Sequence, residues 1–321
     1  MEEEDISKKP LVSVGVLTYN SAKTVLETLE SIKAQTYENI ELIISDDASK
    51  DNTVEVCKKW IEENKGRFVR CEVLTVPENT GIPANANRRL MASNGVWSKG
   101  IAADDILAHD CVENFINYTK ENPDAKIIFA KMQRFKEVFK EENFREITDA
   151  NAKCFCETYK TAEEQYNALL RRMRCSPVTM FANLKILKEI KYDESFKTVE
   201  DYPMWLRLTT SGVKFSYMDK LVAYYRLSPN SISASDCSDL RKTMRFGKSI
   251  KNFKMTYICP NLPFFRRMKL RFTFLKIDIF DKLGLLKENA SPRKLALLRL
   301  LNAMTSPFIL LKKLKTKQKP K

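Results

Sequence analysis

The chain has 321 residues, 44% of them hydrophobic and 30% charged, which is typical of a folded globular protein with a sizeable core. Glycine is scarce at 8 residues and His109 is the single histidine, so a glycine-rich phosphate loop is disfavoured and a zinc site built on several histidines is excluded. The net charge of +14 is uneven, because residues 241–321 carry 22 basic and 3 acidic side chains whereas residues 1–240 have a net charge of −5.

Strand-like and helix-like patterns alternate over the first hundred residues. Short apolar runs predict strands over residues 11–17, 40–44, 71–76 and 96–102. Apolar residues at helical spacing predict a helix capped by Ser21, a second capped by Asp51 and a third over residues 83–92. This alternation predicts an α/β fold with a mostly parallel sheet covered by helices, in which ligands bind beyond the carboxyl ends of the strands.

The same kind of pattern continues beyond residue 105. It predicts helices over residues 110–119, 162–172 and 200–211, a strand over 126–130, and closing strands over 213–217 and 221–225. The charged and aromatic stretch 131–148 fits either a hairpin or an extended excursion.

Adjacent acidic residues occur at three positions of this pattern: Asp46-Asp47 after the second strand, Asp104-Asp105 after the fourth, and Glu200-Asp201 at a helix start. Carboxylates at a strand end suit a hard cation such as Mg²⁺ or Mn²⁺, although acidic residues there also make turns and helix caps. A helix dipole at Asp201 keeps its carboxylate ionised, which suits a general base and a simple cap equally. The residues alone leave these alternatives open.

Four segments resemble family 2 glycosyltransferases of the GT-A fold and together cover roughly residues 10–235. They are VSVGVLTYNSAKTVLETLESIKAQTYENIELIISDDASKDNT (12–53), NTGIPANANRRLMASNGVWSKGIAADD (79–105), EDYPMWLRLTTSG (200–212) and YYRLSPNSIS (224–233). The resemblance implies inverting transfer of a sugar from a nucleotide-diphosphate sugar, with uridine as the preferred nucleotide. The acceptor it implies is a hydroxyl of a saccharide or lipid-linked saccharide, in cell-surface polysaccharide synthesis.

Individual roles follow from the same resemblance. It implies that the nucleotide base is held by Thr18, Tyr19, Asn20 and Asp47, and the ribose by Asp104. Because Ala103 replaces the first aspartate of a three-aspartate motif, Asp105 becomes the main ligand of the divalent metal, Mn²⁺ or Mg²⁺.

On the acceptor side, Asp201 becomes the catalytic base, with Glu200 and Trp205 as support. Many relatives place a histidine where this chain has Leu227-Ser228, so the resemblance leaves the diphosphate to Arg226, Ser231 or Ser233.

Two alternatives to an active glycosyltransferase stay open. One is a catalytically inactive binding protein of the same fold, although the carboxylates of Asp47, Asp105 and Asp201 are all present. The other is a sugar-nucleotide nucleotidyltransferase, which is disfavoured because TYNSAK stands where a glycine-rich, arginine-containing loop would follow the first strand.

The predicted catalytic domain spans residues 1–239, with a nucleotide-binding half over about 10–105 and an acceptor-binding half over about 106–239, followed by a basic helical tail over 240–321. The least charged part of the tail, 295–311, is too short for a helix that spans a membrane and is interrupted by Arg299 and Pro307. A cationic amphipathic segment on an anionic membrane surface is the favoured interpretation, ahead of a packed subdomain, and nucleic acid is disfavoured as a partner.

The cysteine pattern and the first residues predict the compartment. The eight cysteines contain no CxxC pair, and residues 2–5 are acidic rather than the start of a signal peptide. Both features predict a reduced, cytoplasmic setting. The basic tail, together with the lipid-linked acceptor that the resemblance implies, predicts a peripheral position on the inner face of the cell membrane.

Overall fold

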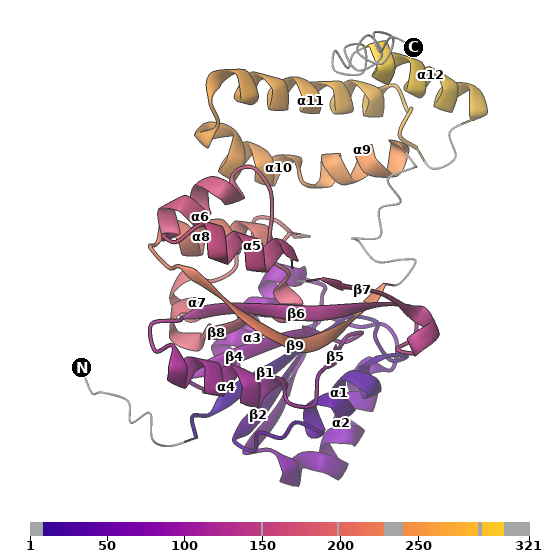
Figure 1. Ribbon diagram of the computed structural model, residues 1–321. Coiled ribbons are helices and arrows are strands. Elements are labelled where there is room, and N and C mark those ends of the chain that lie inside the picture. Colours follow the sequence, from indigo (N-terminus) through magenta and orange to yellow (C-terminus); the bar gives the residue numbers. More distant parts are fainter. Residues whose placement is uncertain (1–8, 149, 198, 228–239, 288–290, 305–321) are drawn as a thin grey trace. The chain divides into compact units, whose positions relative to one another are not determined.

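A nine-stranded sheet lies at the centre of the amino-terminal part of the chain in the computed structural model (Figure 1). The structure describes residues 9–148, 150–197, 199–227, 240–287 and 291–304. The strands are β1 (Val12–Thr18), β2 (Ile40–Asp46), β3 (Arg70–Leu74), β4 (Trp97–Ala102), β5 (Ile106–Leu107), β6 (Ile127–Lys136), β7 (Phe144–Thr148), β8 (Phe181–Asn183) and β9 (Phe215–Leu227). Their order is β3-β2-β1-β4-β8-β6-β9-β5, with β7 paired to β6.

Helices connect these strands and cover both faces of the sheet. They are α1 (Val25–Lys33), α2 (Thr53–Asn64), α3 (Ile82–Ala92), α4 (Cys111–Glu121), α5 (Ala150–Thr158), α6 (Ala162–Leu169), α7 (Leu184–Ile190) and α8 (Asp201–Thr210). The strands β1, β2, β3 and β4 pair in parallel, as the alternating sequence pattern predicts. The carboxyl ends of these four strands therefore meet at one edge of the sheet.

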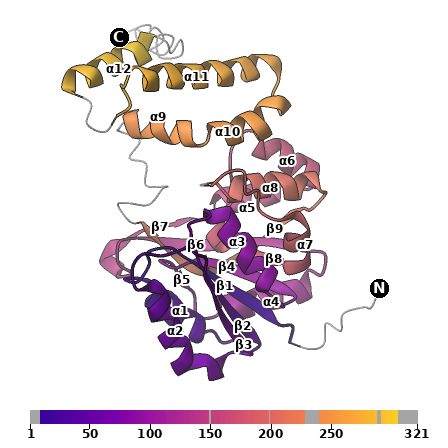
Figure 2. The ribbon, with the colours of Figure 1, turned by 180° about the vertical axis from the view of Figure 1, so that it is seen from behind.

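The two faces of β1 are packed differently. Val12, Val14 and Val16 face a hydrophobic core that also holds side chains of α1, α2 and α4. The other face, over which α3 lies in Figure 2, carries Gly15, directly beneath the buried side chain of Arg89. A Cβ atom at residue 15 would lie 2.1 Å from Arg89 Cδ, so only glycine lets this side chain cross the strand.

Beyond β4 the sheet becomes mixed. The short strand β8 runs antiparallel to both β4 and β6, whereas β6 and β9 are parallel. Of the two structures predicted for residues 131–148, the hairpin is the one observed, since β7 pairs antiparallel with β6. The prediction of two closing strands is wrong, because residues 215–227 form the single long strand β9, which stays paired to β6 across two register shifts.

The predicted cap of the first helix is also wrong. The carbonyl oxygen of Ser21 accepts the N–H groups of Thr24 and Val25 (3.0 and 2.9 Å), so residues 21–24 form a turn and α1 begins only at Val25. The cap predicted for the second helix is one residue early, because Asn52 is the N-cap of α2, although Asp51 Oδ1 accepts the N–H of Thr53 (3.1 Å).

The chain divides into two compact units, residues 1–231 and 232–321. The predicted domain boundary between residues 239 and 240 adjoins a segment outside the described residues. The second unit contains α9 (Leu240–Ser249), α10 (Lys251–Phe253), α11 (Phe264–Lys282) and α12 (Pro292–Met304), with a hydrophobic core of its own. In the part of the chain that the structure describes, no helix is both long and apolar enough to cross a bilayer.

Candidate active site

The turn after β2 holds two aspartates with different surroundings. Asp46 accepts hydrogen bonds from the Thr18 hydroxyl (2.7 Å) and the Ser49 N–H (2.8 Å), so its carboxylate builds the turn. Asp47 points to the start of α3, where it accepts the N–H groups of Thr80 (3.0 Å) and Gly81 (2.8 Å). These contacts define the Asp47 corner of the site.

Two further groups complete the partners of Asp47. The Thr80 hydroxyl donates to Asp47 Oδ1 (2.5 Å), and Arg88 Nη2 lies 3.3 Å from the same oxygen. Burial alone would raise the pKa of Asp47, but these hydrogen bonds outweigh it and the pKa is lowered. Asp47 is therefore a fully partnered anion at neutral pH.

The three residues at the end of β1 that were predicted to hold the base differ in accessibility. The Thr18 side chain is buried, and Asn20 is fixed in a left-handed conformation, with φ of 51°, in which its side-chain oxygen accepts the Lys50 N–H (2.7 Å). The Tyr19 ring is 49% exposed at the edge where the parallel strands end. Of these three, Tyr19 is the side chain best placed to meet a ligand.

Asp104 and Asp105 follow β4 at the same edge. Asp105 Oδ1 accepts the backbone N–H of Arg226 (2.9 Å), and Arg226 Nε donates to the Asp104 carbonyl oxygen (2.8 Å). The guanidinium of Arg226 also pairs with Glu27 and lies 4.3 Å from the centre of the Phe139 ring. Arg226, at the end of β9, thus fixes this Asp104–Asp105 turn.

Burial dominates the electrostatics of this turn. Desolvation raises the pKa of Asp104 and raises that of Asp105 well above its usual value, with repulsion from Asp104 adding to the second shift. Behind the turn, burial lowers the pKa of Lys99 to about 8, and its ammonium donates to the Val178 carbonyl (2.6 Å).

This turn fits a divalent cation. No group of three or more His, Cys, Asp or Glu side chains gathers as a ready-made metal site within the described residues. Two neighbouring carboxylates with raised pKa values nevertheless form a hard-oxygen donor set whose repulsion a cation would relieve, with other coordination positions left to substrate oxygens and water. Asp105, assisted by Asp104, is the pair that would hold it.

Glu200 and Asp201 lie at the start of α8, where the N–H of Tyr202 donates to Asp201 Oδ1 (2.7 Å). Desolvation raises the pKa of Asp201 to about 6, and desolvation together with the Asp201 charge raises that of Glu200 to about 8. Near pH 7 this pair therefore holds one proton between its two carboxyl groups, and the lower of the two pKa values is that of Asp201.

Trp205 does not reach a surface where an acceptor could bind. Its side chain is fully buried, its indole N–H donates to the Cys175 carbonyl (3.3 Å), and its ring packs edge-on against Phe129. Trp205 thus supports the site by fixing α8 on the sheet.

Helix α3 connects the segment before Asp201 to the Asp47 corner. The N–H of Ile82 donates to the Lys197 carbonyl (3.2 Å), and the Asn87 side chain exchanges hydrogen bonds with both backbone groups of Tyr192 (2.8 and 2.9 Å). The segment leading to Asp201 is thereby fastened to the helix whose start binds Asp47. Asp47 and the segment before Asp201 therefore share α3 as a common support.

Sequence reasoning missed several residues of this arrangement: Glu27, Thr80, Gly81, Arg88 and Phe139. Arg88 and Thr80 lie within the segment that carries the resemblance, yet no local pattern distinguishes them. Their roles arise from contacts with Asp47 across 41 and 33 residues of chain.

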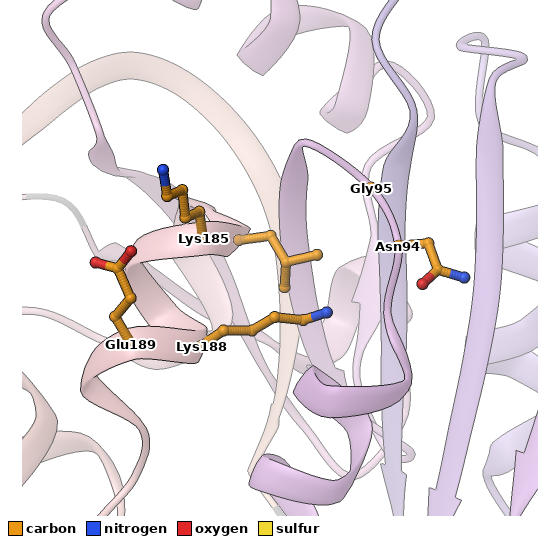
Figure 3. Close-up of a pocket in the computed structure, with 6 residues that line it drawn as sticks. Asn94, Gly95, Lys185, Lys188 and Glu189 are labelled. Carbon is orange, nitrogen blue, oxygen red and sulfur yellow. The ribbon is translucent and has the colours of Figure 1, made fainter. Parts of the chain in front are cut away.

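A surface pocket of about 390 Å³ lies at the other end of β4, lined by Asn94, Gly95, Leu184, Lys185, Lys188 and Glu189 (Figure 3). Lys188 reaches toward the Asn94–Gly95 turn and donates to the Ser93 carbonyl oxygen (2.6 Å). Since this turn precedes β4 and the aspartates follow it, the pocket is separate from the carboxylate edge.

The chain belongs to glycosyl transferase family 2, whose family model matches residues 13–188. An uncharacterized glycosyltransferase of Methanocaldococcus jannaschii is 28% identical over 224 residues, which is 69% of this chain and 72% of that protein. The Escherichia coli UDP-Glc:alpha-D-GlcNAc-diphosphoundecaprenol beta-1,3-glucosyltransferase WfaP is 26% identical over 242 residues, 75% of this chain and 86% of that protein.

Solved structures share the fold. Residues 1–349 of S. aureus TarS in complex with UDP-GlcNAc match with a TM-score of 0.56 at 18% identity, covering 83% of this chain and 81% of that one. The Pyrobaculum calidifontis mannosyltransferase PcManGT, in complex with GDP-Man and Mn²⁺, matches with a TM-score of 0.53 at 15% identity, covering 97% and 86%. The protein is thus a glycosyltransferase enzyme with the GT-A fold, and family membership removes the nucleotidyltransferase alternative.

Proposed function

We propose that the chain is an inverting glycosyltransferase that moves a sugar from a nucleoside-diphosphate sugar, with UDP as the preferred nucleotide, to a hydroxyl of a saccharide or lipid-linked saccharide. The observation that carries this proposal is the fastening of Asp47 and the segment before Asp201 to the same helix, α3. WfaP is named for a UDP-sugar donor and a lipid-diphosphate acceptor, another relative is a chondroitin synthase, and TarS was solved with UDP-GlcNAc. These names support a role in cell-surface polysaccharide synthesis.

The donor would lie along the edge formed by β1, β2 and β4. The exposed Tyr19 ring suits stacking on the nucleotide base, with Thr18, Asn20 and Asp47 shaping the pocket around it. Asp104 would meet the ribose, and Arg226 would hold the turn that faces the diphosphate. The other residues predicted for the diphosphate, Ser231 and Ser233, lie outside the described residues.

Asp201 supplies the general base of the proposed reaction. In a single displacement the acceptor oxygen bonds to the anomeric carbon, the bond from that carbon to the diphosphate breaks, and the acceptor proton passes to Asp201. A pKa raised to about 6 leaves Asp201 ionised above that pH but basic enough to take a proton. A divalent cation bound by Asp105 and Asp104 would offset the charge on the departing diphosphate.

The region after residue 240 gives the proposed location. Its excess of basic side chains suits the anionic inner face of a cell membrane, where a lipid-linked acceptor would be found. Peripheral binding there would place the enzyme at the surface that holds the acceptor.

The sharpest test replaces the proposed base. In Asp201→Asn we expect transfer to fall by about 10²–10⁴-fold while the donor Kd stays within about threefold, because the amide cannot accept the proton but preserves the shape of the site. The measurements are release of UDP from a panel of UDP-sugars with acceptor and Mn²⁺, and calorimetric titration of donor. Asp124→Asn, an exposed carboxylate before β6, is the matched control and should keep wild-type turnover.

Two results would contradict the proposal. Near-normal turnover in Asp201→Asn would remove this residue as the base while leaving the family unaffected. No donor binding and no nucleoside-diphosphate release by the wild-type chain, across UDP- and GDP-sugars, would favour an inactive binding protein instead.

A further inference from the structure

Helix α11 carries a continuous stripe of exposed apolar side chains. Seven residues, six in α11 and Leu283 directly after it, are 46% to 85% exposed: Phe264, Phe265, Met268, Phe272, Leu275, Ile279 and Leu283. Spacings of three and four residues place Met268, Phe272, Leu275 and Ile279 along one side of the helix. Exposed apolar patches of this kind mark interaction surfaces.

The stripe is not the side of α11 that holds its own unit together. Phe274, Ile277 and Phe280 are buried in the core of the second unit, together with Met244 of α9 and Leu298 of α12. At 100° per residue these three lie opposite Met268, Phe272, Leu275 and Ile279. The helix is therefore apolar on two opposite sides, of which its unit uses one.

The acidic and basic residues of α11 differ in their partners and exposure. The acidic residues Asp278 and Asp281 form ion pairs with Lys251 and Lys248 of the neighbouring segment, both at 2.5 Å. Helical geometry places exposed Lys269 along one border of the stripe, and exposed Arg271 and Lys282 along the other. Exposed cations thus border the apolar stripe, while both acidic residues of the helix are paired with lysines of their own unit.

We propose that this stripe, residues 264–283, is a membrane-docking surface that lies in the interfacial plane of an anionic bilayer. Its apolar side chains would enter the acyl boundary while the bordering cations meet lipid phosphates. The inference rests on the proposed lipid-linked acceptor for its purpose. Within the basic tail, 240–321, it assigns the docking role to α11, because Leu298 of α12 lies in the core.

The test measures sedimentation of the full chain with vesicles of phosphatidylcholine alone or with phosphatidylglycerol, without donor or acceptor. The stripe variant Phe265→Gln/Phe272→Gln/Leu275→Gln should lose at least about tenfold in partition onto the mixed vesicles. The control Val69→Gln/Met91→Gln/Ile147→Gln removes three residues of the first unit that are 63%, 54% and 52% exposed, and should bind like wild type. Arg271→Gln/Lys282→Gln should lose the preference for phosphatidylglycerol, which high salt should also remove in wild type.

Each result decides the matter. Absence of vesicle binding by the wild-type chain, or equal binding by the stripe variant, overturns the proposal. So does a lipid-independent dimer that the stripe variant dissociates in light scattering, since a second copy would then cover the stripe. Transfer to a water-soluble saccharide is measured in parallel and tests the proposed function separately. If the wild-type chain binds vesicles but shows no transfer, the proposed function fails and the docking surface stands.

Discussion

The Asp47 corner and two pairs of neighbouring carboxylates, Asp104–Asp105 and Glu200–Asp201, are all built from acidic side chains. Their pKa values are nevertheless shifted in opposite directions. Asp47 accepts hydrogen bonds from two backbone amides and a hydroxyl and is paired with Arg88, and its pKa is lowered. In the described part of the chain, none of Asp104, Asp105, Glu200 and Asp201 forms an ion pair, and burial raises all four pKa values.

This difference separates carboxylates that organise the site from carboxylates suited to react. A saturated anion such as Asp47 has little capacity left for a new proton or cation, and it stabilises the start of α3. A desolvated carboxylate with few partners is destabilised in its charged form, so a cation or a proton from a substrate is bound more strongly. The predictions below test this division.

The largest effect is expected from Asp105→Asn. Transfer should fall by more than about 100-fold, because an amide is a poor ligand for a hard cation and the charge on the departing diphosphate is no longer offset. The thermal midpoint of the metal-free chain should not fall, because the change removes a buried charge repelled by Asp104. Calorimetric titration with Mn²⁺ checks the loss of metal binding, and thermal unfolding checks the stability. Unchanged stimulation of transfer by Mn²⁺ would exclude Asp105 as the metal ligand.

An intermediate effect is expected from Asp47→Asn, which, unlike Asp105→Asn, should destabilise the folded chain. The variant should lose about 1–3 kcal/mol in the free energy of unfolding, since it weakens the contacts to Gly81, Thr80 and Arg88. Because the folded-state pKa is lowered, the stabilisation by Asp47 is present above the unfolded value of about 4 and is lost as the pH falls further. Urea unfolding at pH 7 and pH 3 should therefore show the gap between wild type and variant closing at the lower pH.

The smallest effect concerns Glu200 and the pH dependence of kcat/KM. Activity should decrease tenfold per pH unit below about pH 6, because Asp201 with its pKa raised to about 6 becomes protonated and cannot act as a base. Glu200→Gln should keep this acidic limb, because Glu200, with its pKa raised to about 8, is already protonated there. The variant should lose only the inflection near pH 8, whereas a displaced acidic limb would assign the base to Glu200.

The sequence predicted much of the candidate site because position after a strand is a local property. The parallel strands β1 to β4 bring Asp47, Asp104 and Asp105 to one edge, and periodicity alone predicts those strands. The roles suggested for Tyr19 and Asp201 came from family resemblance, and they stay predictions until tested. Arg88 escaped prediction because its partner lies 41 residues away. For Trp205, predicted as acceptor-side support, only the tertiary packing showed that the side chain is fully buried.

The sequence by itself determined the α/β class, the strand ends that carry carboxylates, and the separation of an acidic body from a basic tail. These follow from periodicity and composition, which are properties of short stretches of chain. Tertiary structure alone decided which carboxylates are saturated and which are destabilised, since Asp105 meets Arg226 across 121 residues. It also decided which apolar residues of the tail stay exposed, because only the folded α11 shows which of its two apolar sides the core of its unit uses.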